Sequence, residues 1–369
     1  MRGGPSQGGP AVGKLTWAVR LGANAQNRLC HPIPSGARLV SQSIGVAFFD
    51  PALEAEIKER VAAVETTLRD VVKSDNPLLH EASRHLVDAG GKRFRPLLVL
   101  LGAQFGDPDA PGVVPAAVVV ELTHLGTLYH DDVMDEAALR RGAPSANSRW
   151  DNTVAILTGD FLFARASDIV ADLGPEVVRI QARTFERLVT GQIKETLGPA
   201  EGEDPLTHYL TVVAEKTGSL IATSARFGAM LSGAPEGVAD LLTQFGERIG
   251  VAFQLADDVL DIASDAADSG KTPGTDLREG VPTLPVLHAL ASKDPADARL
   301  RTLLSEPLTD DALHAEALRL LRAHHAMELA RLDARQWAAQ ARALLDRLPD
   351  IPAKSALTAL CDAVVSRTG

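Results

Sequence analysis

The chain has 369 residues, of which 45% are hydrophobic and 4% aromatic, and its formal net charge at pH 7 is −11. This acidic balance argues against a general nucleic-acid-binding protein, and an anionic substrate would require cations concentrated locally. Cys30 and Cys361 are too few for a disulfide framework or a zinc site and fit a cytoplasmic protein, and no apolar run is long enough to span a membrane.

Residues 1–47 differ from the rest of the chain. They are rich in Gly, Pro and Ser, contain several Arg but no Asp or Glu, and show no sustained apolar periodicity. Disorder, or a start codon assigned too far upstream, is the preferred interpretation, and an Arg-rich targeting peptide is the alternative. A single folded domain is expected over residues 48–369.

From Pro51 onward, apolar residues recur at three- and four-residue spacing, which predicts helices almost throughout. The pattern predicts a helix over 51–73, one ending at Gly90–Gly91, one opening near Pro96 and a buried one from Pro115. Further helices are expected at about 153–172, 175–197, 205–216, 219–232 and 236–265, then over 312–348 and after Pro352. No alternating strand pattern is persuasive, so the predicted fold is all-α, a single large bundle with buried central helices.

Two groups of three aspartates share one spacing, Asp-Asp-x-x-Asp. They are Asp131, Asp132 and Asp135, at the far end of the helix from Pro115, and Asp257, Asp258 and Asp261, with Gln254 one turn before them. Like charges at this spacing repel, so each group costs stability unless a cation lies among the carboxylates. Either group alone could be a solvated acidic surface. Two copies inside apolar helices indicate a diphosphate held between them through several Mg²⁺ ions, which prefer carboxylate and phosphate oxygens.

Basic residues adjoin both acidic groups. They are Lys92, Arg93 and Arg95 in "GGKRFRP", Arg140 and Arg141 after the first group, Lys216 beside Thr217 in "EKTG", and Lys271 after the second group. Any one of them is most simply a solvated surface residue. Their common placement beside the aspartates instead predicts a phosphate-binding site, for which arginine and lysine are both suited.

The ordered motifs GGKRFRP, ELTH, DDVMD, RRG, GD, GQ, EKTG, FQLADD–VLD and GKTPGTDL, over about residues 85–290, resemble those of trans-isoprenyl diphosphate synthases of the polyprenyl synthetase family, in particular the long-chain synthases of bacteria. The resemblance implies an all-α isoprenoid synthase fold with a central cavity between two Asp-rich helices, and a homodimer. It also implies a reaction that joins isopentenyl diphosphate to an allylic diphosphate, with about three Mg²⁺ ions per active site.

The resemblance further implies a role for each matching residue. The implied metal ligands are Asp131, Asp132, Asp135, Asp257, Asp258 and Asp261. The implied catalytic residues are Lys216 and five of these aspartates, namely Asp131, Asp132, Asp135, Asp257 and Asp258. The allylic diphosphate would be held by Arg140, Lys216 and Lys271, with Thr217 and Gln254 lining that site. The isopentenyl diphosphate pocket would contain Lys92, Arg95, His124 and Arg141, with Arg93 in the same motif. The metals draw diphosphate from the allylic substrate, the isopentenyl double bond attacks the resulting cation, and the departing diphosphate takes the proton.

Two positions depart from the better-known short-chain members of the family. Val281 stands where they carry a second phosphate-facing lysine, which removes one contact expected for the allylic diphosphate. The C-terminal "SRTG" offers one basic residue, Arg367, to cover the active site. Neither change affects the predicted metal ligands.

Product length is expected to depend on the residues below the first acidic group. Thr127 and Gly126 lie four and five positions before Asp131, and Thr123 lies another turn away. Bulky aromatics at these positions stop chain growth early in the family, so the small residues predict an open tunnel and a product of roughly six to ten isoprene units by analogy. Such chains commonly become the side chain of a respiratory quinone such as menaquinone. Gly126 could instead serve close helix packing, and a floor from another helix would overturn the prediction.

Several other classes of protein share parts of this pattern. A terpene cyclase shares the fold and first acidic group, but DDVLD and GGKRFRP argue against it. A C15–C20 synthase, an all-α Mg²⁺-dependent nucleotide pyrophosphohydrolase and a regulatory subunit of a heteromeric synthase remain as alternatives, although regulatory subunits tend to lose metal ligands. His130 beside Asp131 resembles the His-Asp pair of metal phosphohydrolases, but the additional metal-binding histidines are not evident. We therefore expect His130 either to pack against its neighbours or to support a metal ligand without touching the metal. The expected partners are the two diphosphate substrates, and no binding of nucleic acid is expected. Transient contact with a membrane is expected during product release.

Overall fold

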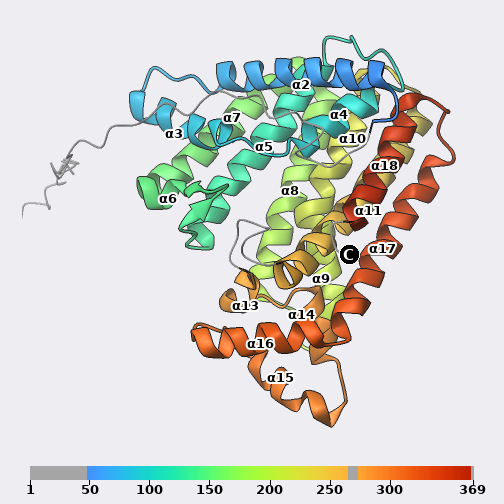
Figure 1. Cartoon of the computed structure of the whole chain (residues 1–369). Coiled ribbons are helices and arrows are strands. Elements are labelled where there is room, and N and C mark those ends of the chain that lie inside the picture. The colour runs from blue at the N-terminus through green and yellow to red at the C-terminus, as the bar shows by residue number, and fades with distance from the viewer. Residues whose placement is uncertain (1–47, 265–272, 367–369) are drawn as a thin grey trace, which may run out of the picture. The chain divides into compact units, whose positions relative to one another are not determined.

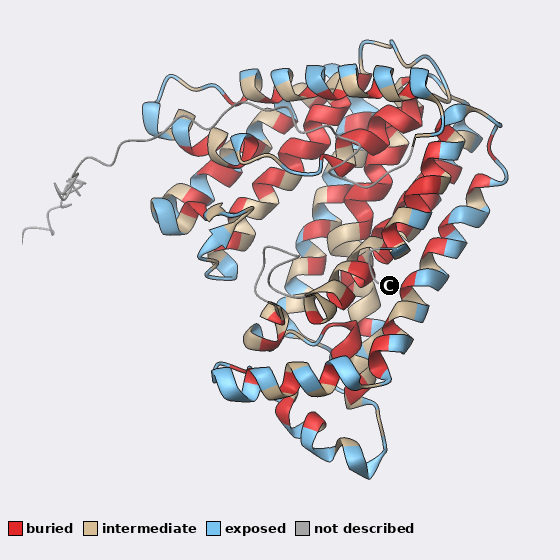
Figure 2. Cartoon of the chain, viewed as in Figure 1, coloured by how far each residue is buried: buried red, intermediate tan, exposed pale blue. Residues whose placement is uncertain are grey.

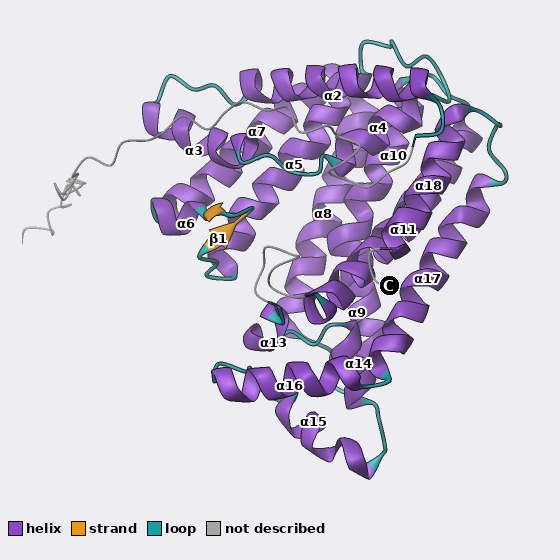
Figure 3. Cartoon of the chain, in the orientation of Figure 1, coloured by secondary structure: helices purple, strands orange, loops and turns teal. Residues whose placement is uncertain are grey.

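The structure is a computed structural model that describes residues 48–264 and 273–366, all within one compact unit, Arg38–Gly369. Over these residues it is all-α apart from one short hairpin (Figure 3), so the predicted fold class is confirmed. Residues 1–47, Lys271 and Arg367 lie outside the described residues, and the predictions made for them stay predictions.

The elements follow one another closely along the chain (Figure 1). The first helices are α2 (Pro51–Val71), α3 (Pro77–Asp88), α4 (Phe94–Ala103) and α5 (Val113–Met134). After the antiparallel strands β1 (Leu139–Arg140) and β2 (Ala143–Pro144) come α6 (Ala146–Arg149), α7 (Asn152–Leu173) and α8 (Pro175–Leu197). Next are α9 (Pro205–Val213), the π-helical turn η1 (Ala214–Gly218), α10 (Ser219–Leu231) and α11 (Glu236–Ala263). The last are α13 (Thr275–Glu279), α14 (Leu284–Leu290), the 3₁₀ turn η2 (Pro295–Asp297), α15 (Ala298–Leu303), α16 (Asp311–Ala323), α17 (Ala326–Leu345) and α18 (Pro352–Ser366).

The helix starts follow from local sequence signals. The N-cap side chains of α2, α3, α7, α9 and α16 accept backbone N–H groups of the first turn, and they are Asp50, Asn76, Asp151, Asp204 and Asp310. Proline follows at the start of α2, α3 and α9, where its missing N–H costs nothing. Each such cap typically contributes about 1 kcal/mol. These signals explain why the predicted start of α8, at Pro175, agrees with the structure.

The structure differs from the sequence-based prediction where no periodic signal exists. The β1–β2 hairpin was not predicted, because strands of two residues have no measurable alternation. The helix expected over 312–348 is divided near His324, whose backbone is extended, into α16 and α17. The helix expected over 205–216 passes instead through η1 directly into α10.

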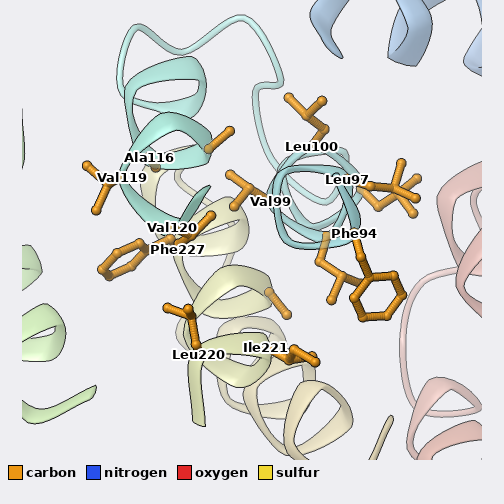
Figure 4. Packing of buried hydrophobic residues seen from close by; sticks show 14 of the residues in the cluster. Phe94, Leu97, Val99, Leu100, Ala116, Val119, Val120, Leu220, Ile221 and Phe227 are labelled. Atoms are coloured by element: carbon orange, nitrogen blue, oxygen red, sulfur yellow. The ribbon is translucent and has the colours of Figure 1, made fainter. Parts of the chain in front are cut away.

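Helix α5 lies inside the larger hydrophobic core and packs against α2, α4, α7 and α10. Figure 2 shows buried residues concentrated on α4, α5 and α10, whereas α2 and α17 each present an exposed face. Figure 4 shows Val99 of α4 pointing toward α5, and Phe227 of α10 lying beside Val120 of α5. Where α4 crosses α10, a Cβ atom on Gly102 would lie 2.7 Å from the Ala225 carbonyl oxygen, so only glycine permits this approach.

A second hydrophobic cluster joins the C-terminal half of α11 to α14, α16 and α17. Its buried members include Leu255, Val259, Leu284 and Ala330. This cluster fixes the end of α11 that carries the second acidic group. Across the described ranges, no helix is both long enough and apolar enough to cross a lipid bilayer.

Candidate active site

The first acidic group lies at the C-terminal end of α5. Asp132 is fully buried, and its Oδ1 accepts a hydrogen bond of 2.5 Å from Arg140 Nε. The other oxygen, Asp132 Oδ2, is buried and has no hydrogen-bond partner among the described residues. The β1–β2 hairpin turns back over α5 and brings Arg140 Nη2 to 3.7 Å from Asp135 Oδ2. Arg140 follows the aspartates by a turn or more in the sequence, and the hairpin brings it back into contact with them.

Lys216 reaches the same group from η1. Its ammonium forms an ion pair with Glu195 of α8. Burial lowers the pKa of Lys216, but the charges of Glu195 and Asp131 outweigh burial, so the pKa is raised. Burial raises the pKa of Asp131 to about 6, with Lys216 opposing the shift and Asp135 adding to it. Glu195 was missed by the sequence analysis, although it stands at the end of the quoted "GQ" segment, in "GQIKE".

The backbone of η1 lies close against α8, and this close approach fixes its position. A Cβ atom on Gly191 of α8 would lie 2.8 Å from the Lys216 backbone nitrogen, so a side chain there would push the two elements apart. Pi-helical turns are rare and often occur at functional sites. The turn displaces Lys216 and Thr217 from the register of a continuous helix, which no sequence periodicity predicts.

The second acidic group is held by a chain of side-chain hydrogen bonds. Thr217 Oγ1 donates to Gln254 Oε1 at 3.1 Å, and Gln254 Nε2 donates to Asp258 Oδ1 at 2.9 Å. Tyr209 of α9 donates its hydroxyl to Asp258 Oδ2. Burial raises the pKa of Asp258 to about 7, although the bonds from Tyr209 and Gln254 lower it. Tyr209 was also missed, because a tyrosine in "PLTHYL" carries no distinguishing signal.

Asp261 connects the second group to α13. Its Oδ1 lies 3.3 Å from the Thr275 backbone nitrogen and its Oδ2 lies 3.4 Å from that of Asp276. Glu279, at the end of α13, has a raised pKa because of burial and because the charges of both Asp135 and Asp261 reach it. One aspartate of each acidic group therefore lies within electrostatic reach of Glu279.

These carboxylates fit a divalent cation that is shared with other ligands. Among the described residues, no group of three or more His, Cys, Asp or Glu side chains is gathered closely enough to hold a metal alone. Mg²⁺ usually keeps several waters and takes one or two carboxylates together with substrate phosphates. The buried and unpartnered Oδ2 of Asp132 and the oxygen-only donor set fit that kind of site.

A second cationic group lies between α4, α5 and the β1–β2 hairpin. Burial lowers the pKa of His124 well below its ordinary value, and Arg95 and Arg141 add to the decrease, so the imidazole is neutral at pH 7. Lys92 Nζ lies 5.9 Å from the ring centroid of Phe253 on α11. The structure thus brings together Arg95, His124 and Arg141, three of the residues predicted for the isopentenyl diphosphate pocket.

Arg93 differs from the other residues of its motif because its guanidinium is buried and paired within the protein. It is 4% exposed, and its guanidinium donates to Glu65 Oε1 at 2.5 Å and Glu121 Oε1 at 2.8 Å. It also donates to the carbonyl oxygens of Val87 and Gly90. These contacts tie Arg93 to the protein and indicate that it positions the loop.

Gly126 faces α7. A Cβ atom on it would lie 3.0 Å from Cζ of Phe163. The Phe163 ring also packs against Phe185 of α8, with centroids 4.5 Å apart. One turn away, Thr123 Oγ1 accepts a hydrogen bond of 2.7 Å from Gln181. A side chain from another helix therefore lies against Gly126, because the missing Cβ lets the ring approach. The predicted open tunnel stays a prediction.

His130 packs against α7 as well. Its Nε2 lies 3.1 Å from the Ile156 carbonyl oxygen and 3.4 Å from Asp160 Oδ1. Nearby, the Thr127 hydroxyl donates to the His124 carbonyl oxygen at 2.8 Å. These contacts tie His130 to α7, and its role stays a prediction.

Comparison with known proteins identifies the family of the chain. The Polyprenyl synthetase family matches residues 76–321. The chain is 52% identical over 326 residues to the nonaprenyl diphosphate synthase of Mycobacterium tuberculosis, covering 88% of this chain and 97% of that protein. It is 43% identical to the dimethylallyltranstransferase of the same organism, over 87% of this chain and 98% of that one.

A solved structure of a related protein has a similar fold. The geranylgeranyl pyrophosphate synthase of Corynebacterium glutamicum, complexed with calcium and isoprenyl diphosphate, superposes with a TM-score of 0.78 at 47% identity. The alignment covers 88% of this chain and 100% of that one. A fold and site of this kind define a trans-prenyltransferase. The chain belongs to the polyprenyl synthetase family.

Proposed function

We propose that the protein condenses isopentenyl diphosphate with an allylic diphosphate and repeats the step to make a long-chain all-trans polyprenyl diphosphate. The observation that carries the proposal is the arrangement of the two acidic groups, with one aspartate of each within electrostatic reach of Glu279 and with Arg140 and Lys216 beside the first. A site of this composition suits a diphosphate that is shared between cations and metal-bound carboxylates.

In the proposal, Mg²⁺ would be held by Asp131, Asp132 and Asp135 from α5 and by Asp257, Asp258 and Asp261 from α11. The support is the donor chemistry of the six carboxylates and the unpartnered Asp132 Oδ2. When bound, the metal would supply Lewis-acid stabilisation of the charge on the leaving diphosphate. About three ions per site are expected from the family.

The chain's own cations would act on the allylic diphosphate. Lys216 keeps its charge, since its pKa is raised, and Arg140 lies between the two carboxylates of Asp132 and Asp135. Thr217 and Gln254 would line this site, and Lys271 is proposed as a third cation. Fixed positive groups of this kind stabilise the oxygen charge that develops as the bond breaks.

The reaction balances without another reactant. The allylic carbon–oxygen bond breaks, and its electron pair leaves with the diphosphate. The isopentenyl double bond supplies the electron pair of the new carbon–carbon bond. The proton then lost from the isopentenyl unit passes to an oxygen of the departing diphosphate, so no side-chain base is required.

Product length belongs to the proposal too. A long chain is supported by the identity to a protein named as a nonaprenyl diphosphate synthase, and we extend this by family analogy to the side chain of a respiratory quinone such as menaquinone. A C15–C20 product is the second candidate. It is favoured by the Phe163 ring beside Gly126, which narrows the space below the first acidic group.

We also propose a homodimer that acts in the cytoplasm. The support is an exposed apolar stripe on α8, formed by Val178, Val189 and Ile193, with Ile156 and Leu157 exposed on α7. Contiguous exposed apolar side chains of this kind usually mark an interaction surface. Sedimentation of the purified protein would test the dimer.

Product analysis tests the proposed function. Purified protein is incubated with labelled isopentenyl diphosphate, Mg²⁺ and, separately, C5, C10, C15 and C20 allylic diphosphates. A ladder that ends in a long prenyl chain is the expected result. A stop at C15 or C20 would overturn the long-chain proposal and keep the reaction, whereas no condensation with any primer would overturn both.

A further inference from the structure

Three arginines and a neutral histidine meet around one buried carboxylate at the N-terminal end of α4. Glu121, in the middle of α5, is 2% exposed, and a charge so deeply buried requires paired partners. Its Oε1 accepts from Arg93 Nη1 at 2.8 Å and lies 3.9 Å from Arg141 Nη2. Burial lowers the pKa of Arg95 to about 10, and the charge of Glu121 opposes this decrease.

Glu65 supports this arrangement from α2. Its Oε1 accepts from Arg93 Nε at 2.5 Å, and its Oε2 lies 3.3 Å from Arg93 Nη2 and 3.3 Å from Arg69 Nη2. Arg93 therefore lies between two carboxylates from different helices. Its backbone has a φ of 48°, a left-handed conformation that is unfavourable for a residue with a side chain. The two ion pairs compensate for that unfavourable backbone.

Arg141 is held against the same loop. Its guanidinium donates to the carbonyl oxygens of Leu86, at 2.9 Å, and of Gly90. A Cβ atom on Gly91 would lie 2.8 Å from the Arg141 Cζ atom, so the guanidinium lies directly across the glycine pair. The same Gly90 carbonyl oxygen also accepts from Arg93, so both arginines hold this loop.

Arg95 is the exception among the three. Its Nε is buried and has no hydrogen-bond partner in the described part of the chain. The three arginines carry one more charge than Glu65 and Glu121 neutralise, and exposed Lys92 adds another. The carboxylates thus occupy the donors of Arg93, hold Arg141 and leave Arg95 for an anion.

We propose that Glu121 is a positioning residue of the isopentenyl diphosphate pocket, with Glu65 as its second support. Its carboxylate holds Arg93 and Arg141 against the loop 90–93, and this keeps Arg95, in the first turn of α4, in place for the phosphate oxygens of the substrate. Glu121 itself touches no substrate. The inference rests on the proposed function, because it assumes that this cationic group receives isopentenyl diphosphate.

Steady-state kinetics of Glu121→Gln test the inference. The neutral amide keeps the size of the side chain and removes the charge that pairs the arginines. The KM for isopentenyl diphosphate, measured at saturating allylic primer, should rise by about tenfold or more. The KM for the allylic diphosphate should change by less than about twofold, since that substrate is proposed to bind at the aspartates. Glu121→Asp, which keeps the charge, should recover part of the loss.

Glu65→Gln and Glu59→Gln complete the series. Glu65→Gln should give a smaller rise in the same KM, because Glu121 still holds Arg93. Glu59 is an exposed residue of the same helix, and Glu59→Gln should leave both KM values unchanged. A circular-dichroism melt of each variant separates a binding defect from unfolding. If Glu121→Gln does not fold, the KM of Glu65→Gln for isopentenyl diphosphate tests the positioning role in its place.

An unchanged KM for isopentenyl diphosphate in the folded variants, or an equal rise for both substrates, would overturn the positioning role. The wild-type protein in the same assay separates this failure from a wrong proposed function. If the wild type condenses the substrates while Glu121→Gln matches it, only the present inference fails. If the wild type shows no condensation, the proposed function fails and the positioning role fails with it.

Discussion

The aspartates of the first acidic group should cost the metal-free protein stability, and Asp131 allows this cost to be measured. Its pKa is raised from 3.8 to about 6 by burial. Because the pKa of Asp131 is higher in the folded state than in the unfolded state, the folded state binds more protons at pH values between the two pKa values. Stability from this group is therefore full below the unfolded pKa and is lost as the pH rises through the folded pKa.

The magnitude follows from the same two values. One pKa unit corresponds to about 1.4 kcal/mol, so the penalty on the charged native state approaches about 3 kcal/mol at pH 7.5. At pH 4.5 the carboxyl is protonated in the folded state, and the penalty is only about 1 kcal/mol. Asp131→Asn imitates the protonated form at every pH. The variant should thus be more stable than the wild type by about 3 kcal/mol at pH 7.5 and by about 1 kcal/mol at pH 4.5.

Urea denaturation followed by far-ultraviolet circular dichroism, with a chelator present, measures this difference. Asp168→Asn, on the exposed face of α7, serves as a matched control and should show no comparable gain. Added Mg²⁺ and diphosphate should stabilise the wild type and the control more than Asp131→Asn, which should also lose nearly all turnover. A variant that is less stable than the wild type at pH 7.5, or a difference that does not depend on pH, would refute the reasoning.

Three further changes probe the site and its surroundings. Asp257→Ala should nearly abolish turnover with unchanged helical content, and full activity would contradict the proposed metal site. Tyr209→Phe removes the donor to a buried Asp258 oxygen and should lower the unfolding free energy by about 1–3 kcal/mol in urea titrations, while a neutral result would show that water replaces the hydroxyl. Gly126→Phe must displace the Phe163 ring, so it should destabilise by about 1–3 kcal/mol and shorten the product, whereas Phe163→Ala should lengthen it. Product chromatography checks this pair, and unchanged lengths in both variants would show that the prenyl tail lies elsewhere.

The helices and the acidic groups could be predicted because their signals are local. Apolar spacing, Asp and Asn caps and helix-starting prolines act within a few residues, and they located α8 and most of α7 from the sequence. The repeated Asp-Asp-x-x-Asp spacing likewise needs no partner to be recognised. Glycines at turns and crossings were visible in the sequence too, but the sequence does not show which helix approaches each of them.

What escaped prediction depends on contacts between distant segments. Tyr209 and Glu195 join the site only because α8, η1, α9 and α11 pack together there. The Phe163 ring lies some distance along the chain from Gly126, so nothing in the local pattern reveals that the ring lies against this glycine. The role of Arg93 was also hidden, because a motif shows that a basic residue is present and not which carboxylates surround it.

The sequence by itself determined the helical fold, the six aspartates and the cations around them, since residue type and spacing specify this chemistry directly. Only the tertiary structure decided which charges are paired and which are left for a ligand. Burial and packing set those choices: they raise the pKa values of Asp131 and Asp258, occupy Arg93, and leave Arg95 Nε without a partner among the described residues. Electrostatic energies depend on distance and solvent access, and neither is specified until the helices have packed.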